Sequence, residues 1–437
     1  MKKIILLSIL LNSYFCSFSQ DNLSDKYRAM ALNYNYDLKS AQRNIESSIE
    51  LEKMASASLK PSLAGNANFK YIGNPTELNF SLPIMDEPLG FKGQHSNYGA
   101  GITIFQPIYT GGKLLESLKK AQYQHSLSEN QKQIIVSSVC SQTDFQYWNT
   151  VARNEVVGIS EEYKNSVKSL VKTIKERVDA GLINTQDLLM AEVKLNEAEY
   201  NLLQAKNNFD IGRMALNSMI GVNLSDNTEI QNEVPIIIAD PNLWDYNNIR
   251  PEIEAAQSNI QIAKSNLKIN NSKYLPQLSI GAEGTYGKPG YDFKPDLDPN
   301  YGVYAKLSVP IFEWGKRRNE KKISLYQVGI AEDNLYKTKD KVNLETQTAR
   351  ISLSQSLQRV ELAESSLHKA MENEKKATER YMAGEITIIE VIDAQVYRMN
   401  TQINFTEAKV NAQSSYVQLI KALNLYGSDG NIISLYK

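Results

Sequence analysis

The stretch Arg177-Val178-Asp179-Ala180-Gly181 recurs further along the chain as Arg380-Tyr381-Met382-Ala383-Gly384. The shift of 203 residues from Gly181 to Gly384 also carries Pro107 onto Pro310. A shift that is kept over such a distance without insertions is typical of an internal repeat. The sequence therefore predicts two copies of one structural unit.

The placement of proline indicates where the long helices lie. No proline occurs between residues 108 and 234 or after residue 310, and proline disrupts helix interiors. Apolar residues at spacings of three and four predict two antiparallel coiled-coil hairpins. The expected helices run from Lys113 to about Ala180, back to about Ile220, from Lys316 to about Met382, and from Thr387 to about Leu425. A first helix of that length would extend on the order of 100 Å.

Shorter elements precede each hairpin. Helices are expected at 33–59 and 250–274, which align at a shift of 215. Alternating apolar and polar residues then predict strands at 62–81, 98–108, 277–286 and 301–312, each able to supply the ~9–11 residues of a membrane-spanning strand. The Pro-, Gly- and Asp-rich stretches 83–97 and 288–300 are expected as exposed loops.

These patterns give a domain organisation for the whole chain. We expect a signal peptide at 1–19, a first repeat at 20–221, a linker or equatorial segment at 222–249, a second repeat at 250–427 and a tail at 428–437. The β-hairpins are expected at about 62–108 and 277–312, and the helical hairpins at about 113–221 and 316–425.

The N-terminus has the features of a secretory signal. Lys2 and Lys3 precede the apolar run 4–11, and small residues flank Phe18 near the expected cleavage site. Lipidation of Cys16 is disfavoured because the bulky Phe15 precedes it. Cys140 is then the single cysteine of the mature protein, so we expect no intrachain disulfide and a small buried side chain.

Charge and residue pattern argue against nucleic-acid binding and catalysis. The formal net charge of −1 would become −3 without Lys2 and Lys3, and a nucleic-acid partner is not expected. His95, His125 and His368 are scattered and have no metal-ligand spacing. No phosphate-binding loop or nucleophile motif occurs. We therefore expect no catalytic residue, no metal and no cofactor, and a protein that is not an enzyme.

Four strands cannot form a closed barrel, and an open sheet edge is costly in lipid. The strands must pair with further strands or with other subunits, and about eight strands make the smallest closed barrel. Three copies would give twelve strands. Long helices beneath such a barrel would extend the pore away from the membrane.

At this point the chain resembles the TolC-type outer-membrane efflux proteins over essentially its whole mature length. The residues that carry the resemblance are the paired turns 177–181 and 380–384, the following segments 187–191 and 390–394, the start of the second copy at 250–253, and the strand ends 107–113 and 310–316. Each of these motifs is weak alone, but they are duplicated and occur in order.

The resemblance implies a mainly α fold with a small β part. It implies a homotrimer whose twelve-stranded outer-membrane β-barrel continues into a periplasmic α-helical barrel. It also implies that the channel itself is passive. An inner-membrane transporter of the resistance-nodulation-division or ABC type does the pumping, and a periplasmic adaptor protein joins this transporter to the channel. Outer-membrane lipid is the remaining implied partner. Drugs, metal ions, siderophores and secreted polypeptides fit such a pore equally well.

Two carboxylates near the second turn suggest a gate. Glu390 and Asp393 are three residues apart, which places both on one helix face. In a three-fold assembly they would form two stacked acidic rings, and the resemblance matches them to constricting rings of the family. The alternative is a pair of solvated carboxylates favoured by the helix dipole.

Asp187 and Tyr381 match positions where the family holds the tip shut by hydrogen bonds between hairpins. A basic partner seen in some members is replaced by Ile386. The copies differ here, because Val178 aligns with Tyr381 and Met190 aligns with Asp393. This asymmetry predicts that only the second hairpin carries the double acidic ring and the tyrosine.

Gly181 and Gly384 are expected to cap the hairpin turns, with Arg177 and Arg380 beside them. The resemblance implies that adaptor proteins dock near such turns, and a plain helix C-cap is the alternative. The alternative function for the whole chain is a periplasmic adaptor or structural coiled-coil protein. An adaptor would have one hairpin flanked by globular β domains, whereas this sequence predicts two equal hairpins.

Overall fold

The computed structural model describes residues 23–80, 89–246, 248–290 and 296–433. The expected signal peptide and Cys16 lie outside these residues. The elements follow in the order α2 (Leu23–Tyr34), α3 (Tyr36–Ala57), β1 (Ser62–Tyr71), β2 (Glu77–Phe80), β3 (Leu89–Lys92), β4 (Ser96–Tyr109), α4 (Lys113–Asp179), α5 (Thr185–Ile220), η1 (Pro241–Trp244), α6 (Pro251–Ser272), β5 (Gln277–Lys288), β6 (Asp298–Ser308), α7 (Lys316–Met382) and α8 (Ile388–Ala422).

The element bounds confirm the duplicated unit. Helices α4 and α7 each contain 67 residues, and both their first and last residues are 203 positions apart. Helices α3 and α6 each contain 22 residues, at the expected shift of 215. The fold is thus mainly helical, with a small sheet, and is built from two equivalent sets of elements.

Two expectations for the shorter elements were wrong. The helix expected at 33–59 is α3, but it begins later, at Tyr36, because the Asn35 Oδ1 accepts the Leu38 backbone N–H at 2.9 Å and caps it. A separate helix, α2, precedes it and was not predicted. The strand expected at 62–81 ends at Tyr71, and β2 resumes after Pro75. Strand β2 pairs with β3, which lies inside the stretch expected to be a loop. Pro75, which cannot donate to a strand ladder, lies in the gap between the β1–β4 pairing and the β2–β3 pairing.

Two compact units can be distinguished in the chain. The helical unit comprises Met1–Gln42, Asn130–Ile253 and Lys337–Lys437, and the sheet unit comprises Arg43–Glu129 and Glu254–Tyr336. Each unit contains parts of both sequence repeats, and helices α3, α4, α6 and α7 contribute residues to both units. No described helix has the length and apolar character needed to cross a bilayer.

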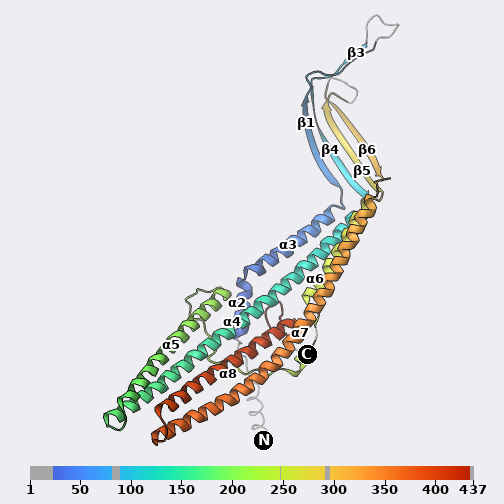
Figure 1. Cartoon of the computed structure of the whole chain (residues 1–437). Helices are drawn as coiled ribbons and strands as arrows, with labels where there is room; N and C mark the ends of the chain where they lie inside the picture. Colours follow the sequence, from blue (N-terminus) through green and yellow to red (C-terminus); the bar gives the residue numbers. More distant parts are fainter. Residues whose placement is uncertain (1–22, 81–88, 247, 291–295, 434–437) are drawn as a thin grey trace, which may run out of the picture. The chain divides into compact units, whose positions relative to one another are not determined.

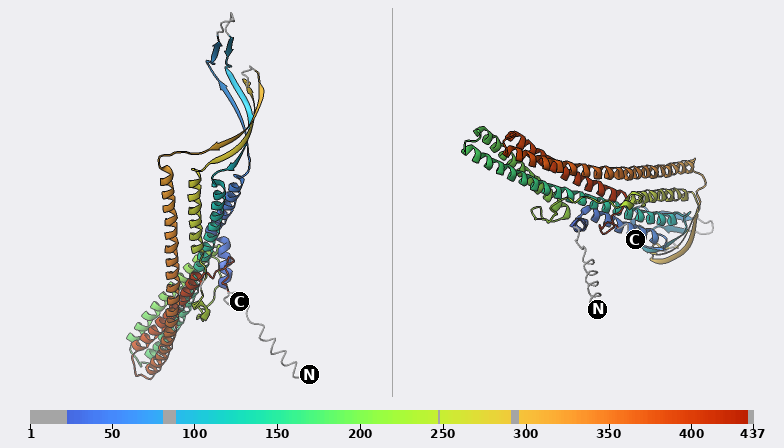
Figure 2. Two further views of the ribbon diagram at one scale, coloured as in Figure 1. Left: turned by 90° about the vertical axis from the view of Figure 1, so that its right-hand side faces the viewer. Right: turned by 90° about the horizontal axis from the view of Figure 1, so that it is seen from below.

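In the sheet unit, four antiparallel strands form one sheet in the order β1-β4-β5-β6 (Figure 1). The strands bend along their length (Figure 2). The helix segments of this unit lie in the matching order α3-α4-α6-α7. The contacts that join them are Gln122 with Glu52 at 3.2 Å, Lys268 with Glu116 at 3.2 Å, and Asn270 with Ser324 at 3.1 Å.

In the helical unit, α4 pairs with α5 and α7 pairs with α8 as two hairpins (Figure 1). Its main core gathers residues from α2, α4, α5, α8 and the C-terminal segment, among them Val151, Leu216 and Leu419, which are fully buried. Cys140 belongs to this core and is also fully buried, as expected from the sequence. Burial raises the pKa of the Cys140 thiol to about 12.

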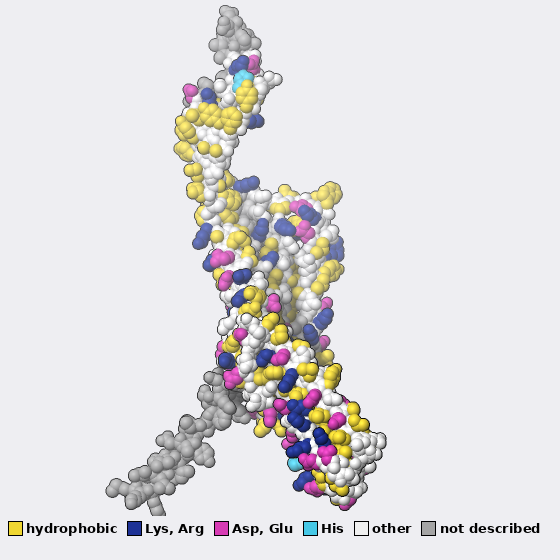
Figure 3. Space-filling model, turned by 90° about the vertical axis from the view of Figure 1, so that its left-hand side faces the viewer, with side chains coloured by type: hydrophobic (Ala, Val, Ile, Leu, Met, Phe, Trp, Pro, Cys, Tyr) yellow, Lys and Arg dark blue, Asp and Glu magenta, His cyan; other side chains and the backbone are white. Residues whose placement is uncertain are grey.

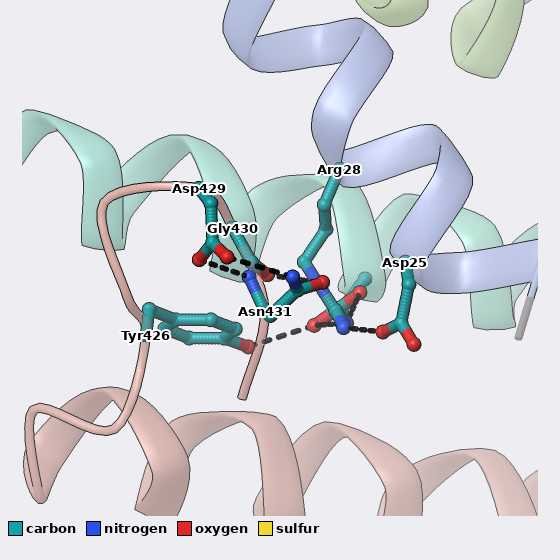
Figure 4. A network of polar contacts seen from close by, with 7 residues as sticks. Asp25, Arg28, Tyr426, Asp429, Gly430 and Asn431 are labelled. Carbon is teal, nitrogen blue, oxygen red and sulfur yellow. Dashed lines mark hydrogen bonds and ion pairs between the residues drawn. The ribbon is translucent and has the colours of Figure 1, made fainter. Parts of the chain in front are cut away.

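A buried polar network fastens both ends of the described chain to α4. Arg28 of α2 donates two hydrogen bonds to the Asp144 carboxylate, at 2.7 and 2.8 Å, and one to the Gly430 carbonyl at 2.7 Å. It also pairs with Asp25, and Tyr426 donates to Asp144 at 2.8 Å. Figure 4 shows Arg28 pointing from its helix toward Asp25 and the C-terminal segment. Arg28, Asp144 and Tyr426 are almost completely buried.

Candidate functional site

The first candidate site is one face of the sheet. Pairing across all four strands aligns Leu63 with Ile104, Ala282 and Val303, so that row of side chains is entirely apolar. Ala100, Ile102 and Ile104 share this face with Val303, Ala305 and Leu307. Hydrophobic side chains gather over the strands in the space-filling view (Figure 3).

Aromatic side chains lie toward one end of this apolar face. Phe69 pairs with Tyr98, and Tyr286 and Tyr301 lie on the same face in the next two rows of side chains. Val303 is 82% exposed and Tyr301 is 88% exposed in the single chain. An exposed apolar surface that continues across four strands marks an interaction site, and aromatic residues at its end are typical of a membrane interface.

The opposite face of the same strands is polar. Ala64 aligns with Thr103 and Glu283, and Asn66 aligns with Gly101, Thr285 and Asn300. Alternation between an apolar and a polar face is the pattern of a strand with lipid on one side and water on the other. In the described sheet, β1 and β6 each have a neighbouring strand on one side only. These two edges leave backbone groups available for pairing.

The second candidate site is at the tips of the two helical hairpins. Gly181 has φ +70° and Gly384 has φ +78°, values that favour glycine over other residues. Leu182 donates to the Arg177 carbonyl and Gly181 to the Val178 carbonyl, both at 2.9 Å. The second turn repeats these bonds from Glu385 and Gly384. Both turns are therefore Schellman caps, which explains why the five-residue stretch is repeated.

The tips of the two hairpins pack together around Tyr381. Its side chain is 5% exposed and belongs to an apolar cluster with Ile174, Ala191 and Val391. The guanidinium of Arg177 lies over the Tyr381 ring, 5.2 Å from its centre, in a cation–π contact. Arg177 and Tyr381, which the sequence singled out separately, are therefore in contact.

The hydroxyl of Tyr381 is buried and has no hydrogen-bond partner among the described residues. Burial raises its pKa above the ordinary value, and the charge of the nearby Asp187 raises it further, while Arg177 lowers it. Asp187 is half-buried. Among the described residues the Tyr381 hydroxyl therefore makes none of the inter-hairpin hydrogen bonds that the resemblance implies for this position, and the contact of Arg177 with the Tyr381 ring joins the hairpins.

Glu390 and Asp393 are both exposed, in the first turns of α8. Glu390 also has a local role, because its Oε1 accepts the Thr387 backbone N–H at 3.2 Å in a capping box. Asp393 lines a groove between α5 and α8 together with Leu189, Met190, Val193, Ile389 and Ile392. Arg380 is exposed and pairs with Glu385 at 3.2 Å.

Sequence reasoning missed the polar contacts that join α4 to α8 above the tips. Gln395 donates to the Ser166 hydroxyl at 2.9 Å, and Arg398 pairs with Glu162. Further from the tips, Lys409 pairs with Glu155 at 2.7 Å. The sequence contains a pattern that could have indicated these contacts. A stripe of polar residues runs along α8 at spacings of three and four, through positions 395, 398, 402, 406, 409 and 413.

The model of the family described as "Outer membrane efflux protein" matches residues 28–222 and 247–425 of this chain. A curated relative, the "Solvent efflux pump outer membrane protein SrpC" of Pseudomonas putida, is 24% identical over 410 residues, which cover 90% of this chain and 83% of that protein.

Solved structures have the same fold. The Campylobacter jejuni CmeC outer membrane channel superposes with a TM-score of 0.76 at 19% identity, covering 94% of this chain and 87% of that one. The outer membrane protein VceC of Vibrio cholerae gives a TM-score of 0.77 at 16% identity, with 94% and 97% covered.

Proposed function

This chain belongs to the outer membrane efflux protein family, and from that membership we propose that three copies of it form a passive exit channel. It is an outer-membrane efflux protein with a large helical part in the periplasm. Members of this family are channels and not enzymes.

The observation that carries the proposal is the two-faced sheet with two open edges. An apolar face on all four strands suits contact with lipid acyl chains, and a polar face suits a water-filled lumen. The unpaired edges of β1 and β6 cannot remain open in a bilayer. Pairing β6 of one copy with β1 of the next closes twelve strands in a trimer, above the minimum of about eight.

In this proposal the chain supplies the conduit across the outer membrane and the upper periplasm. An inner-membrane transporter of the resistance-nodulation-division or ABC type supplies energy and selects the substrate, and a periplasmic adaptor protein joins the two. The names of relatives such as the solvent efflux pump protein support membership of a multi-protein pump. The paired tip turns at Gly181 and Gly384, with Arg177 and Arg380, are the proposed docking region for the adaptor.

The oligomeric state tests this proposal. Native mass spectrometry of the mature protein in detergent is expected to give three copies, and the trimer should dissociate on heating with a shift in electrophoretic mobility. A monomer that stays soluble without detergent would contradict a channel, and would favour an adaptor or structural coiled-coil protein.

A pair of adjacent substitutions tests the assignment of the sheet faces. Ile102→Lys places a charge on the apolar face, where it should destabilise the folded barrel by about 2–4 kcal/mol if the residue lies near the bilayer midplane. Thr103→Lys places the same charge on the polar face and should have little effect. Denaturant-induced unfolding in vesicles measures both, and equal destabilisation by the two variants would argue against the lipid-facing assignment.

We propose that Glu390 and Asp393 form two stacked acidic rings at the periplasmic mouth of the trimer. Six carboxylates at close range repel one another and attract cations. Tyr381, Asp187 and Arg177 are the proposed contacts that hold the two hairpins of each subunit together below these rings. Their proximity in the single chain supports this role.

Neutralising both rings is expected to lower the selectivity of the channel for cations over anions several-fold. Glu390→Gln with Asp393→Asn removes the charges while retaining an acceptor for the capping box. Reversal potentials across a planar bilayer with a salt gradient give the selectivity. Asp210→Asn, at an exposed pair on α5, is the control and should leave it unchanged. Unaltered selectivity in the double variant would reject the ring assignment.

A further inference from the structure

The interface between α4 and α8 joins the first hairpin to the second and contains three sets of polar contacts. Starting nearest the tips, these are Gln395 with Ser166, Arg398 with Glu162, and Lys409 with Glu155. Their burial and their hydrogen bonding differ along the interface. The contacts therefore differ in how much free energy is needed to separate them.

In the contact furthest from the tips, both oxygens of the Glu155 carboxylate accept hydrogen bonds. Lys409 and Thr406 both donate to Glu155 Oε1 at 2.7 Å, and the Val234 backbone N–H donates to Oε2 at 2.9 Å. The side chains of Lys409 and Glu155 are 6% and 12% exposed. Lys409 has no second carboxylate partner among the described residues. Separating this pair would leave a buried charge without a partner, which is strongly destabilising.

The Arg398 contact is built differently, because Arg398 has one partner in each hairpin. Its guanidinium donates to Glu374 of α7 at 3.1 Å, within its own hairpin, and to Glu162 of α4 in the other hairpin. Arg398 and Glu374 are 16% and 13% exposed, whereas Glu162 is 53% exposed. If α8 moves away from α4, Arg398 keeps Glu374 and Glu162 becomes hydrated. Separation here therefore costs little, as for a surface ion pair.

The layer around Arg398 is also incompletely bonded. The Arg398 Nε and the Gln395 Oε1 are buried without hydrogen-bond partners among the described residues. Both line a small cavity with Ser166 and Glu374. Incompletely satisfied polar layers stabilise an interface less than fully bonded ones. The two ends of the α4–α8 interface thus differ in strength.

We propose that the Glu155–Lys409 pair is a fixed pivot and that the Arg398–Glu162 pair is a releasable latch between the hairpins. The proposal rests on the channel function given above and assigns to it a positioning residue, Arg398, which lies 14 residues beyond Gly384 on α8. The hairpins part only on the tip side of the pivot, and the latch sets how readily they do so. The apolar Ile386 cannot form an ion pair at the tip. The Arg398–Glu162 latch therefore provides an ion pair between the hairpins on the tip side of the pivot.

Arg398→Gln and Glu162→Gln test the latch by single-channel recording in planar bilayers. Each is expected to raise the mean conductance several-fold. Glu162→Gln should leave the melting temperature of the trimer unchanged, because Glu162 is 53% exposed. Arg398→Gln also leaves the buried Glu374 without its cation and should lower the melting temperature. Lys376→Gln is the matched control, because Lys376 and Glu372 form an exposed pair on the same hairpin at 2.6 Å. Wild-type conductance in both single variants would overturn the latch.

Spin-label distances test the same proposal without relying on conduction. Labels at Leu182→Cys and Met382→Cys report the separation of the two tips, and the native Cys140 is buried and should not react. With labelled chains diluted among unlabelled ones, Arg398→Gln should lengthen this distance and Lys376→Gln should not. A wild-type protein that does not conduct would contradict the channel, whereas an unchanged distance in Arg398→Gln would contradict the latch.

The pivot gives the opposite expectation. Lys409→Gln should lower the melting temperature and the yield of folded trimer, because Glu155 is left buried without a cation. A Lys409→Gln trimer with wild-type stability and a raised conductance would show that this pair releases like the latch, and would reject the distinction between them.

Discussion

Replacing Arg28 with methionine is expected to destabilise the helical unit by about 3–5 kcal/mol, the cost of removing one partner of a buried ion pair. Arg28 holds Asp144, the Gly430 carbonyl and Asp25 at once, and its side chain is 2% exposed. Methionine fills a similar volume, but it leaves the Asp144 carboxylate in the core with the Tyr426 hydroxyl as its one side-chain partner among the described residues. Thermal melting of the helix signal in circular dichroism measures the loss.

Lys376→Met is the control for this experiment, since it removes a cation from a pair that is about two-thirds exposed on both sides. That variant should stay within about 0.5 kcal/mol of the wild type. If Arg28→Met melts at the wild-type temperature, the network is not what fastens the chain ends to α4.

The destabilisation should also depend on pH. Burial raises the pKa of Asp144 above its ordinary value, although Arg28 and Tyr426 oppose the shift. The folded protein then binds a proton that the unfolded chain has already released, so the contribution of this group to stability falls as pH rises from the ordinary value to the raised one. Without Arg28 the pKa of Asp144 rises further. The stability difference between wild type and Arg28→Met should therefore be smaller at pH 5 than at pH 8, and a difference independent of pH would contradict this.

Tyr381→Ala is expected to make cells leaky to bulky antibiotics, with a several-fold fall in the inhibitory concentration. The substitution removes a side chain that is buried between the hairpins and in contact with Arg177. Asp187→Ala should raise the leak in the same direction by weakening the same group of contacts. Antibiotic susceptibility of cells that produce each variant at equal levels measures the effect.

Tyr381→Phe separates packing from hydrogen bonding in this experiment. Because the hydroxyl has no partner among the described residues, phenylalanine should keep the apolar contacts and the wild-type barrier. A phenylalanine variant as leaky as the alanine variant would mean that the hydroxyl bonds across the tip in the assembled trimer. Unchanged leak in Tyr381→Ala would show that Tyr381 does not hold the tip shut.

The long helices could be predicted because their limits are local. Gly181 and Gly384 end α4 and α7 through backbone bonds within five residues, and absence of proline permits the helices before them. The alternation of apolar and polar residues was equally local, and it predicted strands in the regions of β1, β4, β5 and β6. The break at Asn35 was missed because an asparagine cap inside a helical pattern looks like an ordinary polar surface residue.

The contacts between distant segments could not be predicted from the sequence. Arg398 and Glu162 are 236 residues apart, and both have the composition of a solvated helix face. Lys409 with Glu155, and Arg28 with Asp144, are of the same kind. Periodicity identifies the face on which a charge lies but not the charge that it meets on another helix. The gate candidates Glu390 and Asp393 were chosen from spacing and resemblance, and the trimer that would bring their rings together is a proposal.

If this chain forms a channel through the outer membrane, purified mature protein added to a planar lipid bilayer should conduct ions. Discrete, uniform conductance steps that prefer cations are expected, with a lower preference for cations in the Glu390→Gln, Asp393→Asn double variant. Protein that inserts no conducting unit, although its detergent-solubilised form is folded and trimeric, would contradict the channel function.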